Sequence, residues 1–301
     1  MLYGLATYLL WGVFPLYFPL LKPAAPLEIL AHRFVWTAVV MGAVVLVTGA
    51  WRQLARASAR TWGLVLAAAI VIGVNWGTYV LAVNSGHVAE AALGYFINPL
   101  VSVLLGVVFL REQLTRAQLA AVALAVVAVI VLTIGVGRPP WISLTLAFSF
   151  GFYGLIKKRV PLGSAASVAA EALVLTPVAL GYLVFLGGTG EGTFTTEGPA
   201  HTLLLISAGI ATGVPLLLFG AAAKRVTLTS LGLMQYITPL LQMLIAVFVV
   251  HEHISPERWI GFAIIWVAVV VFTVDMLVRA RSRRRARRAA GATGAAGAGT
   301  A

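Results

Sequence analysis

The chain has no cysteine and few charged residues. Of its 301 residues none is Cys, and only 10% are Asp, Glu, Lys or Arg. The lack of cysteine excludes a disulfide framework, a thiolate metal site and a cysteine nucleophile. Because 61% of the residues are hydrophobic and the mean hydropathy is +1.00, no soluble core would enclose all the apolar side chains. The composition predicts an integral membrane protein.

Recognisable catalytic motifs are also lacking. No phosphate-binding G-x-x-x-x-G-K-[ST] segment occurs, which argues against a primary pump. With no complete metal motif and no credible Ser/His pair, we expect no enzyme, no catalytic residue and no cofactor. His251-Glu252-His253 does not meet the zincin pattern, because position 255 is Ser. We therefore predict no metal site.

Long apolar segments dominate what remains. A helical span needs about 20 mostly apolar residues, and cutting the chain at charge clusters and turn residues gives ten candidates. They lie near Leu2–Leu21, Leu27–Ala50, Trp62–Asn84, Ala89–Leu110, Ala117–Val136, Trp141–Ile156, Ala166–Leu186, Thr202–Ala223, Leu228–Val250 and Trp259–Val278. The pattern predicts an all-α integral membrane protein with ten transmembrane helices.

One segment occurs twice. Leu93–Glu112 and Leu233–Glu252 match without a gap at an offset of 140 residues, and 7 of 20 positions are identical. The shared positions are Leu93, Ile97, Pro99, Leu100, Leu104, Val107 and Glu112, with Leu233, Ile237, Pro239, Leu240, Leu244, Val247 and Glu252. A duplicated membrane segment is typical of carriers.

The basic residues predict the orientation. Cytoplasmic loops hold an excess of Lys and Arg, and cytoplasmic termini place 17 of them inside and 3 outside, with Arg33 inside a span. The inside total includes Lys157, Lys158 and Arg159. We therefore expect a multi-pass protein of the plasma membrane with both termini in the cytoplasm.

An odd number of spans in each half inverts the second half relative to the first. We predict one five-helix half over 1–136, another over 141–278, and a cytoplasmic tail over 279–301. Two such halves suggest alternating access to a shared central site. The arginines between Arg279 and Arg288 should attract anionic lipid headgroups of the bilayer rather than nucleic acid, and the Gly/Ala-rich remainder of the tail should be disordered.

Several motifs carry a family resemblance. They are Asn75-Trp76-Gly77, Gly94-Tyr95-Phe96-Ile97-Asn98-Pro99-Leu100, Pro215-Leu216-Leu217-Leu218-Phe219-Gly220, Glu28-Ile29-Leu30-Ala31-His32-Arg33 and Leu231-Gly232-Leu233-x-Gln235-Tyr236-x-x-Pro239. With these motifs, residues 1–275 resemble the RarD subfamily of the EamA, or drug/metabolite transporter, group. The resemblance implies ten helices, two inverted EamA-type halves and a permease. The family label, chloramphenicol-sensitivity protein, names a phenotype and leaves the substrate open.

Three ionisable residues lie together in the second predicted span. An ionisable group in hydrocarbon is costly unless it faces a partner or a wet cavity. Arg33 would hold a carboxylate or another anionic group of a substrate, while His32 or Glu28 would titrate near neutral pH. The alternative is an interfacial cluster that reaches water, or a Glu28–Arg33 pair that locks two helices.

Glu171 is the lone carboxylate of the seventh span, at a place comparable to Glu28 in the other half. A pair of half-related acids would suit proton coupling or cation binding, so Glu28 and Glu171 are the candidate ion-coupling residues. The alternative for Glu171 is a structural acid that is hydrogen-bonded to a neighbouring helix.

Uncharged polar and aromatic residues give a second set of candidates. Asn75, Trp76 and Tyr79 on the third span would form a wall that stacks a planar solute and hydrogen-bonds its edges. The substrate-binding candidates are Arg33, His32, Asn75, Trp76, Tyr79, Asn98, Gln235 and Tyr236. The same amides would also serve as an interhelical clamp.

The repeated prolines and glutamates have separate predictions. Pro99 and Pro239 should each kink a helix and free a carbonyl, as hinges would, although proline is also tolerated in membrane helices without a role. Glu112 and Glu252 should cap the following helix or pair with Arg116 and Arg258.

These observations favour a secondary transporter. The expected substrate is a small neutral or zwitterionic amphipathic metabolite or drug, with proton coupling as the expected drive. A channel or a membrane receptor without coupled transport is the alternative. The sequence leaves open the substrate, the direction of transport and the oligomeric state.

Overall fold

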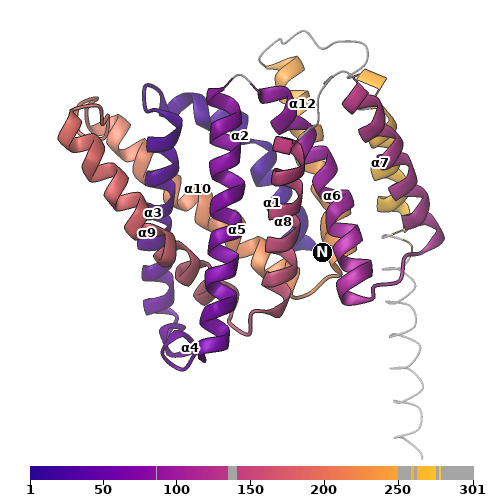
Figure 1. The fold of residues 1–301 in the computed structure, drawn as a ribbon, viewed down its shortest axis with the longest axis horizontal. Coiled ribbons are helices and arrows are strands. Elements are labelled where there is room, and N and C mark those ends of the chain that lie inside the picture. Colours follow the sequence, from indigo (N-terminus) through magenta and orange to yellow (C-terminus); the bar gives the residue numbers. More distant parts are fainter. Residues whose placement is uncertain (86, 135–140, 250–258, 261–262, 276–277, 279–301) are drawn as a thin grey trace, which may run out of the picture.

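The described part of the chain folds into helices and contains no strand (Figure 1). The computed structural model describes residues 1–85, 87–134, 141–249, 259–260, 263–275 and 278. Within these ranges six helices are long and apolar enough to cross a membrane, and two shorter apolar helices span Arg116–Val131 and Ala263–Asp275. The all-α prediction is confirmed, and the count of ten spans is consistent with these helices.

The first half of the chain supplies helices α1 to α7. They are α1 (Leu2–Gly12), α2 (Phe14–Tyr17), the 3₁₀ helix η1 (Phe18–Leu21), α3 (Pro26–Val47), α4 (Trp51–Ala55), α5 (Ala59–Asn84), α6 (Val88–Leu110) and α7 (Arg116–Ile134). The first predicted span is therefore three consecutive helices. The short helix α4 lies in a segment that the sequence placed in a loop.

The second half supplies α8 to α12. They are α8 (Trp141–Arg159), α9 (Ser164–Thr189), α10 (Pro199–Ala223), α11 (Leu228–Gln235) and α12 (Ile237–Phe248). The sixth predicted span was too short, because α8 continues through Lys157 to Arg159. The ninth predicted span is divided at Tyr236 into α11 and α12.

Local sequence explains where several helices begin and end. Pro26 and Pro199 stand at the first positions of α3 and α10, where the absent proline N–H has no intrahelical acceptor to lose. Gly190 ends α9 with a φ of +76°, a left-handed conformation that glycine adopts without strain. Thr227 caps α11, since its hydroxyl accepts a hydrogen bond from Ser230 N at 3.1 Å.

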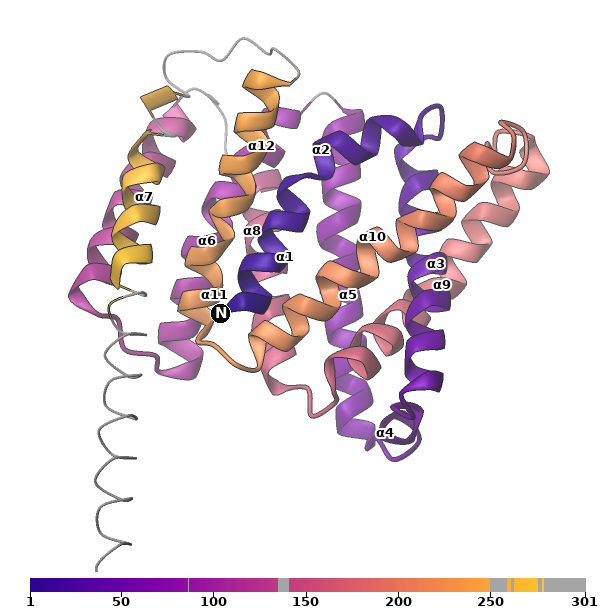
Figure 2. The same ribbon diagram turned by 180° about the vertical axis from the view of Figure 1, so that it is seen from behind.

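The helices form an elongated bundle, and different helices lie at its two ends (Figures 1 and 2). Helices α3, α9 and α10 gather at one end, and α7 lies beside 263–275 at the other. Helices α1, α5, α6, α8, α11 and α12 lie between them. Large apolar side chains such as Val47, Val178 and Val184 remain exposed on the outside, as a lipid-facing surface requires.

Corresponding helices of the two halves run antiparallel. At one end of the α3–α9 pair Glu28 contacts Thr193, which follows α9, and at the other Gln53, which follows α3, contacts Gly163, which precedes α9. Similarly, Glu112 follows α6 and contacts Leu228 and Thr229 at the start of α11. This is the relation that an inverted repeat requires.

The contacts of Glu112 correct one detail of the sequence analysis. Its carboxylate accepts hydrogen bonds from Leu228 N at 2.7 Å and from Thr229 N at 2.8 Å. Glu112 therefore does cap a helix, but the helix is α11 and not the following α7. A carboxylate is favourable there because free N–H groups and the positive end of the helix dipole meet at a helix N-terminus.

Glycine allows close helix contacts at two crossings. A Cβ atom on Gly209 of α10 would overlap the backbone of Trp36 in α3. On α11, a Cβ on Gly232 would lie 2.6 Å from the Cβ of Ser102 and 3.0 Å from the carbonyl oxygen of Pro99 in α6. Small residues at such crossings let membrane helices approach closely.

Candidate functional site

A cavity lies among helices contributed by both halves of the chain. Its wall consists of Phe34 and Thr37 of α3, Ile72 and Trp76 of α5, Tyr153 of α8, Val168, Glu171, Ala172 and Leu175 of α9, and Thr212 and Leu216 of α10. The volume open to the centre of a water molecule is about 20 Å³, which is room for about one water. A metabolite therefore enters only when the surrounding helices move apart.

Arg33 lies against this wall and is held by two of its residues. Its Nε donates a hydrogen bond to Thr212 Oγ1 at 2.9 Å. Its guanidinium lies over the indole of Trp76, 4.2 Å from the ring centroid, a distance at which a cation is attracted to the ring face. Among the described residues no carboxylate lies within 4.0 Å of the guanidinium. The alternative of a Glu28–Arg33 pair is therefore not what the structure shows.

Aromatic rings surround Arg33 on several sides. Trp76 stacks on Phe34 with centroids 5.2 Å apart and planes inclined by 21°. The ring centroids of Phe14 and Phe18 lie 6.0 Å and 5.6 Å from the guanidinium carbon. This end of the cavity combines one fixed positive charge with flat apolar surfaces.

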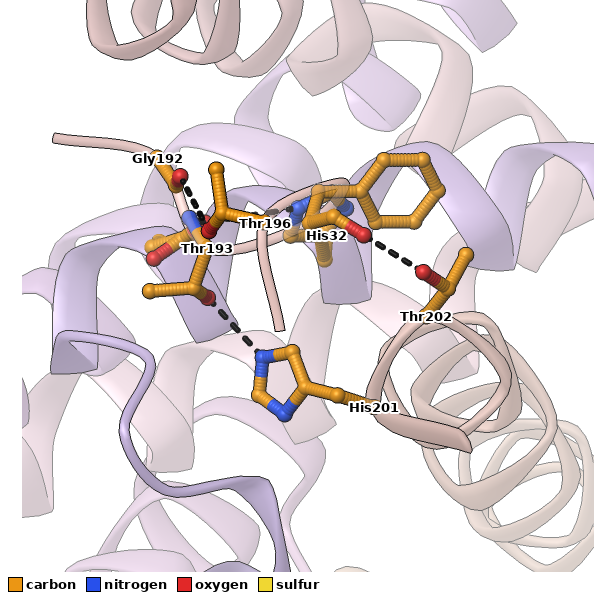
Figure 3. A network of polar contacts seen from close by, with 8 residues as sticks. His32, Gly192, Thr193, Thr196, His201 and Thr202 are labelled. Atoms are coloured by element: carbon orange, nitrogen blue, oxygen red, sulfur yellow. Dashed lines mark hydrogen bonds and ion pairs between the residues drawn. The ribbon is translucent and has the colours of Figure 1, made fainter. Parts of the chain in front are cut away.

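A second group, the Glu28 cluster, consists of Glu28, His32, Thr193, Phe194 and His201. Figure 3 labels its members His32, Thr193 and His201. The Glu28 carboxylate, 1% exposed, accepts a hydrogen bond from Thr193 N at 2.6 Å. The imidazole of His32 stacks on Phe194 at 4.7 Å between centroids. Thr193 Oγ1 lies 2.9 Å from His201 Nε2. The cluster ties the loop between α9 and α10 to the start of α3.

Several polar atoms in the Glu28 cluster have no partner. Both ring nitrogens of His32 and the Oε2 atom of Glu28 are buried without a hydrogen bond among the described residues. His32 Nε2 and Glu28 Oε1 are 4.0 Å apart, so a protonated His32 would form an ion pair there. His32 does not line the cavity that Arg33 contacts.

Tyr153, Lys157, Ser167 and Glu171 form a third group, the Glu171 cluster. Glu171 Oε1 accepts hydrogen bonds from Lys157 Nζ and from the Ser167 hydroxyl, both at 2.7 Å. Glu171 Oε2 accepts one from Tyr153 OH at 2.9 Å. Lys157 Nζ also donates to Ser167 at 2.7 Å. The acid is fully partnered, yet it still forms part of the cavity wall.

The position of Lys157 corrects the charge count. Its neighbours Lys158 and Arg159 predict a cytoplasmic loop, but Lys157 is 1% exposed in the last turn of α8. Its removal from the inside total leaves 16 basic residues against 3. Nearby, Lys224 follows α10, and burial together with Lys157 and Arg225 lowers the pKa of Lys224.

The two clusters occupy matching places in the two halves. A spacing of 139 residues pairs α3 with α9 and leaves six identical pairs: Ala31/Ala170, Val35/Val174, Thr37/Thr176, Val39/Val178, Gly42/Gly181 and Val45/Val184. At this spacing Ser167 matches Glu28, and Glu171 matches His32. Each helix thus carries two interacting polar side chains four residues apart. The expected match of Glu171 with Glu28 is off by one helical turn.

Two of the predicted substrate-binding residues connect helices to each other. Asn75 is 3% exposed, and its Nδ2 donates to Leu146 O at 2.8 Å and to Ser149 Oγ at 3.0 Å in α8. Tyr236 OH donates to Phe96 O in α6 at 3.2 Å. These contacts match the interhelical clamp, which was the alternative interpretation of the amides.

The remaining uncharged candidates for substrate binding are Asn98, Gln235 and Tyr79. Asn98 and Gln235 are 2% and 5% exposed, and their Oδ1 and Oε1 atoms have no hydrogen-bond partner among the described residues. Tyr79 lies 5.9 Å from Tyr95 between ring centroids. None of these residues is part of the cavity wall, whereas Trp76 is.

The two repeated prolines have different local structures. Helix α6 continues through Pro99, whereas the helix that contains Pro239 is interrupted at Tyr236, before α12 begins at Ile237. Since a proline removes the hydrogen bond to the carbonyl four residues before it, Pro239 leaves the carbonyl of Gln235 at this interruption without its helical donor. Only the second copy is interrupted near its proline, and the kink at Pro99 stays a prediction.

Several residues of these sites were missed from the sequence. Thr212, Phe34 and Tyr153 are uncharged residues in apolar spans and gave no signal. Lys157 was assigned to a loop because it adjoins Lys158 and Arg159. Phe194 and His201 lie at a predicted loop. The predictions for Glu252, for His251 and His253, and for the basic tail lie outside the described residues.

Comparisons with known proteins agree on one family. The EamA-like transporter family model matches residues 1–134 and again residues 140–274. "Protein RarD" of Streptomyces exfoliatus is 52% identical over 287 residues, covering 94% of this chain and 91% of that protein. "Uncharacterized transporter YojE" of Bacillus subtilis is 42% identical, covering 94% and 96%. A crystal structure with 21% identity covers 91% and 96% of the two chains with a TM-score of 0.72, so it shares the fold.

Proposed function

Because the chain belongs to the RarD subfamily of the EamA-like transporter family, we propose that it moves a small neutral or zwitterionic amphipathic solute by alternating access. The chain is a multi-pass membrane transporter of the drug/metabolite type. The proposed site is the cavity beside Arg33 and Trp76. Its proposed location is the plasma membrane, with both termini in the cytoplasm.

One observation carries this proposal: the cavity wall comes from both matched segments. Phe34 and Trp76 belong to the first, and Glu171 and Thr212 to the second. When two halves enclose one site, their relative movement opens that site first to one side of the membrane and then to the other. The small volume of the cavity fits a state that holds no solute.

Contacts at the two ends of the α3–α9 pair support the same mechanism. At one end Glu28 accepts a hydrogen bond from Thr193 N at 2.6 Å, and at the other Gln53 Oε1 accepts one from Gly163 N at 2.7 Å. With cytoplasmic termini, the Glu28 contact faces outside and the Gln53 contact faces the cytoplasm. Opening to either side separates the helices at that end and breaks its contact.

We assign proton coupling to Glu171 first and to Glu28 second. Glu171 lies in the cavity wall and forms an ion pair with Lys157 at 2.7 Å. Protonation of Glu171 would weaken this ion pair, and its position in the wall would link that change to what occupies the cavity. Glu28 lies beside His32 at the outer closure. Both acids are buried, where a change in charge has a large energetic effect.

Counterflow in proteoliposomes tests the carrier. Labelled chloramphenicol, a neutral amphipathic probe suggested by the family label, should enter vesicles against unlabelled chloramphenicol with saturable kinetics. An imposed pH gradient should drive its accumulation by the wild type and not by Glu171→Gln, while Glu197→Gln, a change at an exposed loop acid, should behave as wild type. Flux that does not saturate would identify a channel, and accumulation unaffected by the pH gradient would remove proton coupling.

A further inference from the structure

We infer that Arg33 binds a carboxylate of the transported solute, and that an apolar, planar part of the same solute lies against the aromatic wall next to it. The inference rests on the proposed function and narrows its substrate class from neutral or zwitterionic solutes to those that carry a carboxylate. A neutral solute would leave the charge of Arg33 without a counter-ion, whereas a solute with a carboxylate would supply one.

Arg33 carries a positive charge that no described carboxylate pairs with. Arginine stays protonated in proteins, and a charged side chain within a membrane span is expensive unless it is paired or reaches water. Arg33 has no acidic partner within 4.0 Å among the described residues. The nearest acid along α3, Glu28, is engaged by Thr193 N and lies next to His32. The protein therefore keeps an unpaired cation at its cavity, because Glu171, the acid in the cavity wall, is paired with Lys157 instead.

The guanidinium of Arg33 is held in place while two of its donor atoms stay available. The Nε atom donates a hydrogen bond to Thr212 Oγ1 at 2.9 Å. One face of the guanidinium lies on the indole of Trp76, with its carbon 4.2 Å from the ring centroid. Neither Nη atom has a hydrogen-bond partner in the described part of the chain. Two parallel N–H donors at the end of a guanidinium match the two oxygens of a carboxylate. The contacts of Arg33 thus hold its plane in place and leave this pair of donors for a ligand.

The surroundings limit the ligand to one carboxylate with an apolar body. The residue that matches Arg33 in the second half is Ala172, which also lines the cavity, so the site has one cation rather than two. Trp76 and Phe34 are stacked at 5.2 Å and offer a flat surface beside the guanidinium. A planar apolar group gains both burial and ring contacts there.

Thermal unfolding of the purified full-length protein with matched probes tests the inference. The probes are 4-phenylbutyrate, its amide and 4-phenylbutylamine, which share the apolar part and differ in charge. We expect saturable stabilisation by 4-phenylbutyrate and at least about tenfold weaker binding of the other two. Arg33→Gln should weaken 4-phenylbutyrate binding by at least about tenfold. Arg33→Lys should retain part of it, because lysine keeps the charge but loses the paired donors.

Arg52→Gln is the matched control, since Arg52 also lies over an indole, 5.7 Å from the ring of Trp51, but outside the cavity. It should bind 4-phenylbutyrate like the wild type. Equal binding of the acid and the amide, unchanged binding by Arg33→Gln, or no saturable stabilisation by 4-phenylbutyrate would each overturn the inference. If Arg33→Gln does not fold, Arg33→Lys decides, and wild-type affinity in that variant counts against paired recognition.

The same preparations separate this inference from the proposed function. Arg33-dependent binding of 4-phenylbutyrate without counterflow of any probe would refute the carrier and leave the carboxylate site in place. Saturable counterflow of chloramphenicol that is unchanged in Arg33→Gln, together with equal binding of acid and amide, would support the carrier and refute the carboxylate site.

Discussion

The Glu28 cluster and the Glu171 cluster lie at matching places on α3 and α9, but their acids receive different numbers of hydrogen bonds. Glu171 receives three hydrogen bonds, from Lys157, Ser167 and Tyr153. Glu28 receives one, from a loop amide, and one of its oxygens has no partner among the described residues. A satisfied buried ion pair resists change, whereas unpartnered buried groups are costly. The comparison shows a closed charge network on α9 and an incomplete one on α3.

The largest effect should follow from breaking the Glu171 cluster. Lys157→Met leaves Glu171 charged, buried and without its counter-ion, so we expect the free energy of unfolding to fall by about 3–5 kcal/mol. Unfolding titrations in mixed micelles measure this loss. The double variant Lys157→Met/Glu171→Leu should recover most of it, because it removes both charges. A double variant as unstable as the single one would show that the pair does not act as a unit.

The next effect concerns the helix contact that supports the Glu28 cluster. His201 lies on α10, whose Gly209 contacts the Trp36 backbone in α3. Gly209→Ala should lower the free energy of unfolding by about 1–3 kcal/mol, because the added methyl group forces the helices apart. The matched control is Gly42→Ala on α3, where a Cβ would meet nothing within 4 Å. Similar losses in both variants would contradict the close contact.

A smaller effect is expected at Glu28 itself. Glu28→Gln keeps an acceptor for Thr193 N but loses the charge, so we expect a loss of about 1 kcal/mol. Hydrogen exchange of the Thr193 amide should become faster, as local opening of the loop requires. Glu197→Gln changes an exposed acid in the same loop and should leave the exchange rate unchanged. If Glu28→Gln lowers the free energy of unfolding as much as Lys157→Met does, the Glu28 cluster is as fully bonded as the Glu171 cluster, and the proposed difference between them is wrong.

The smallest effect is expected at the far end of the α3–α9 pair. The Gln53–Gly163 contact is exposed, so Gln53→Ala should reduce stability by only about 0.5 kcal/mol. Its effect should be clearer in transport, since a weaker cytoplasmic contact favours opening to that side. Cross-linking of cysteines placed at Ala57 and Ala166, which pack in the same apolar cluster at this end, would measure the opening with and without Gln53→Ala in the otherwise cysteine-free chain. Unchanged cross-linking in Glu197→Gln, a change at an exposed loop acid, is the expected control.

Much of the fold could be predicted because membrane spans have a strong signal. Apolar length located nearly every helix, and the repeat at Leu93 and Leu233 indicated the relation between α6 and α11. The error at Lys157 has a physical cause: a lysine next to two other basic residues is expected in water, and only the carboxylate of Glu171 on another helix explains its burial. The division at Tyr236 was anticipated only as a kink at Pro239.

The candidate site was predictable only in part. Arg33 and Trp76 stood out because charge and indole are conspicuous in an apolar span, and the structure brings them together. Asn75 looked similar in sequence but is used by Leu146 and Ser149 of α8. Whether an amide faces a cavity or a neighbouring helix depends on helix rotation and crossing, which the spacing of residues along one helix does not determine.

The cap on α11 has a consequence for how the two halves depend on each other. Leu228 and Thr229 receive their acceptor from Glu112, a residue on the far side of the chain's midpoint. A second half made alone would begin α11 with two amides that have lost their carboxylate, while a first half made alone would carry an acid without its donors. The end of α6 in the first half thus completes the start of α11 in the second, so each half depends on the other for this cap.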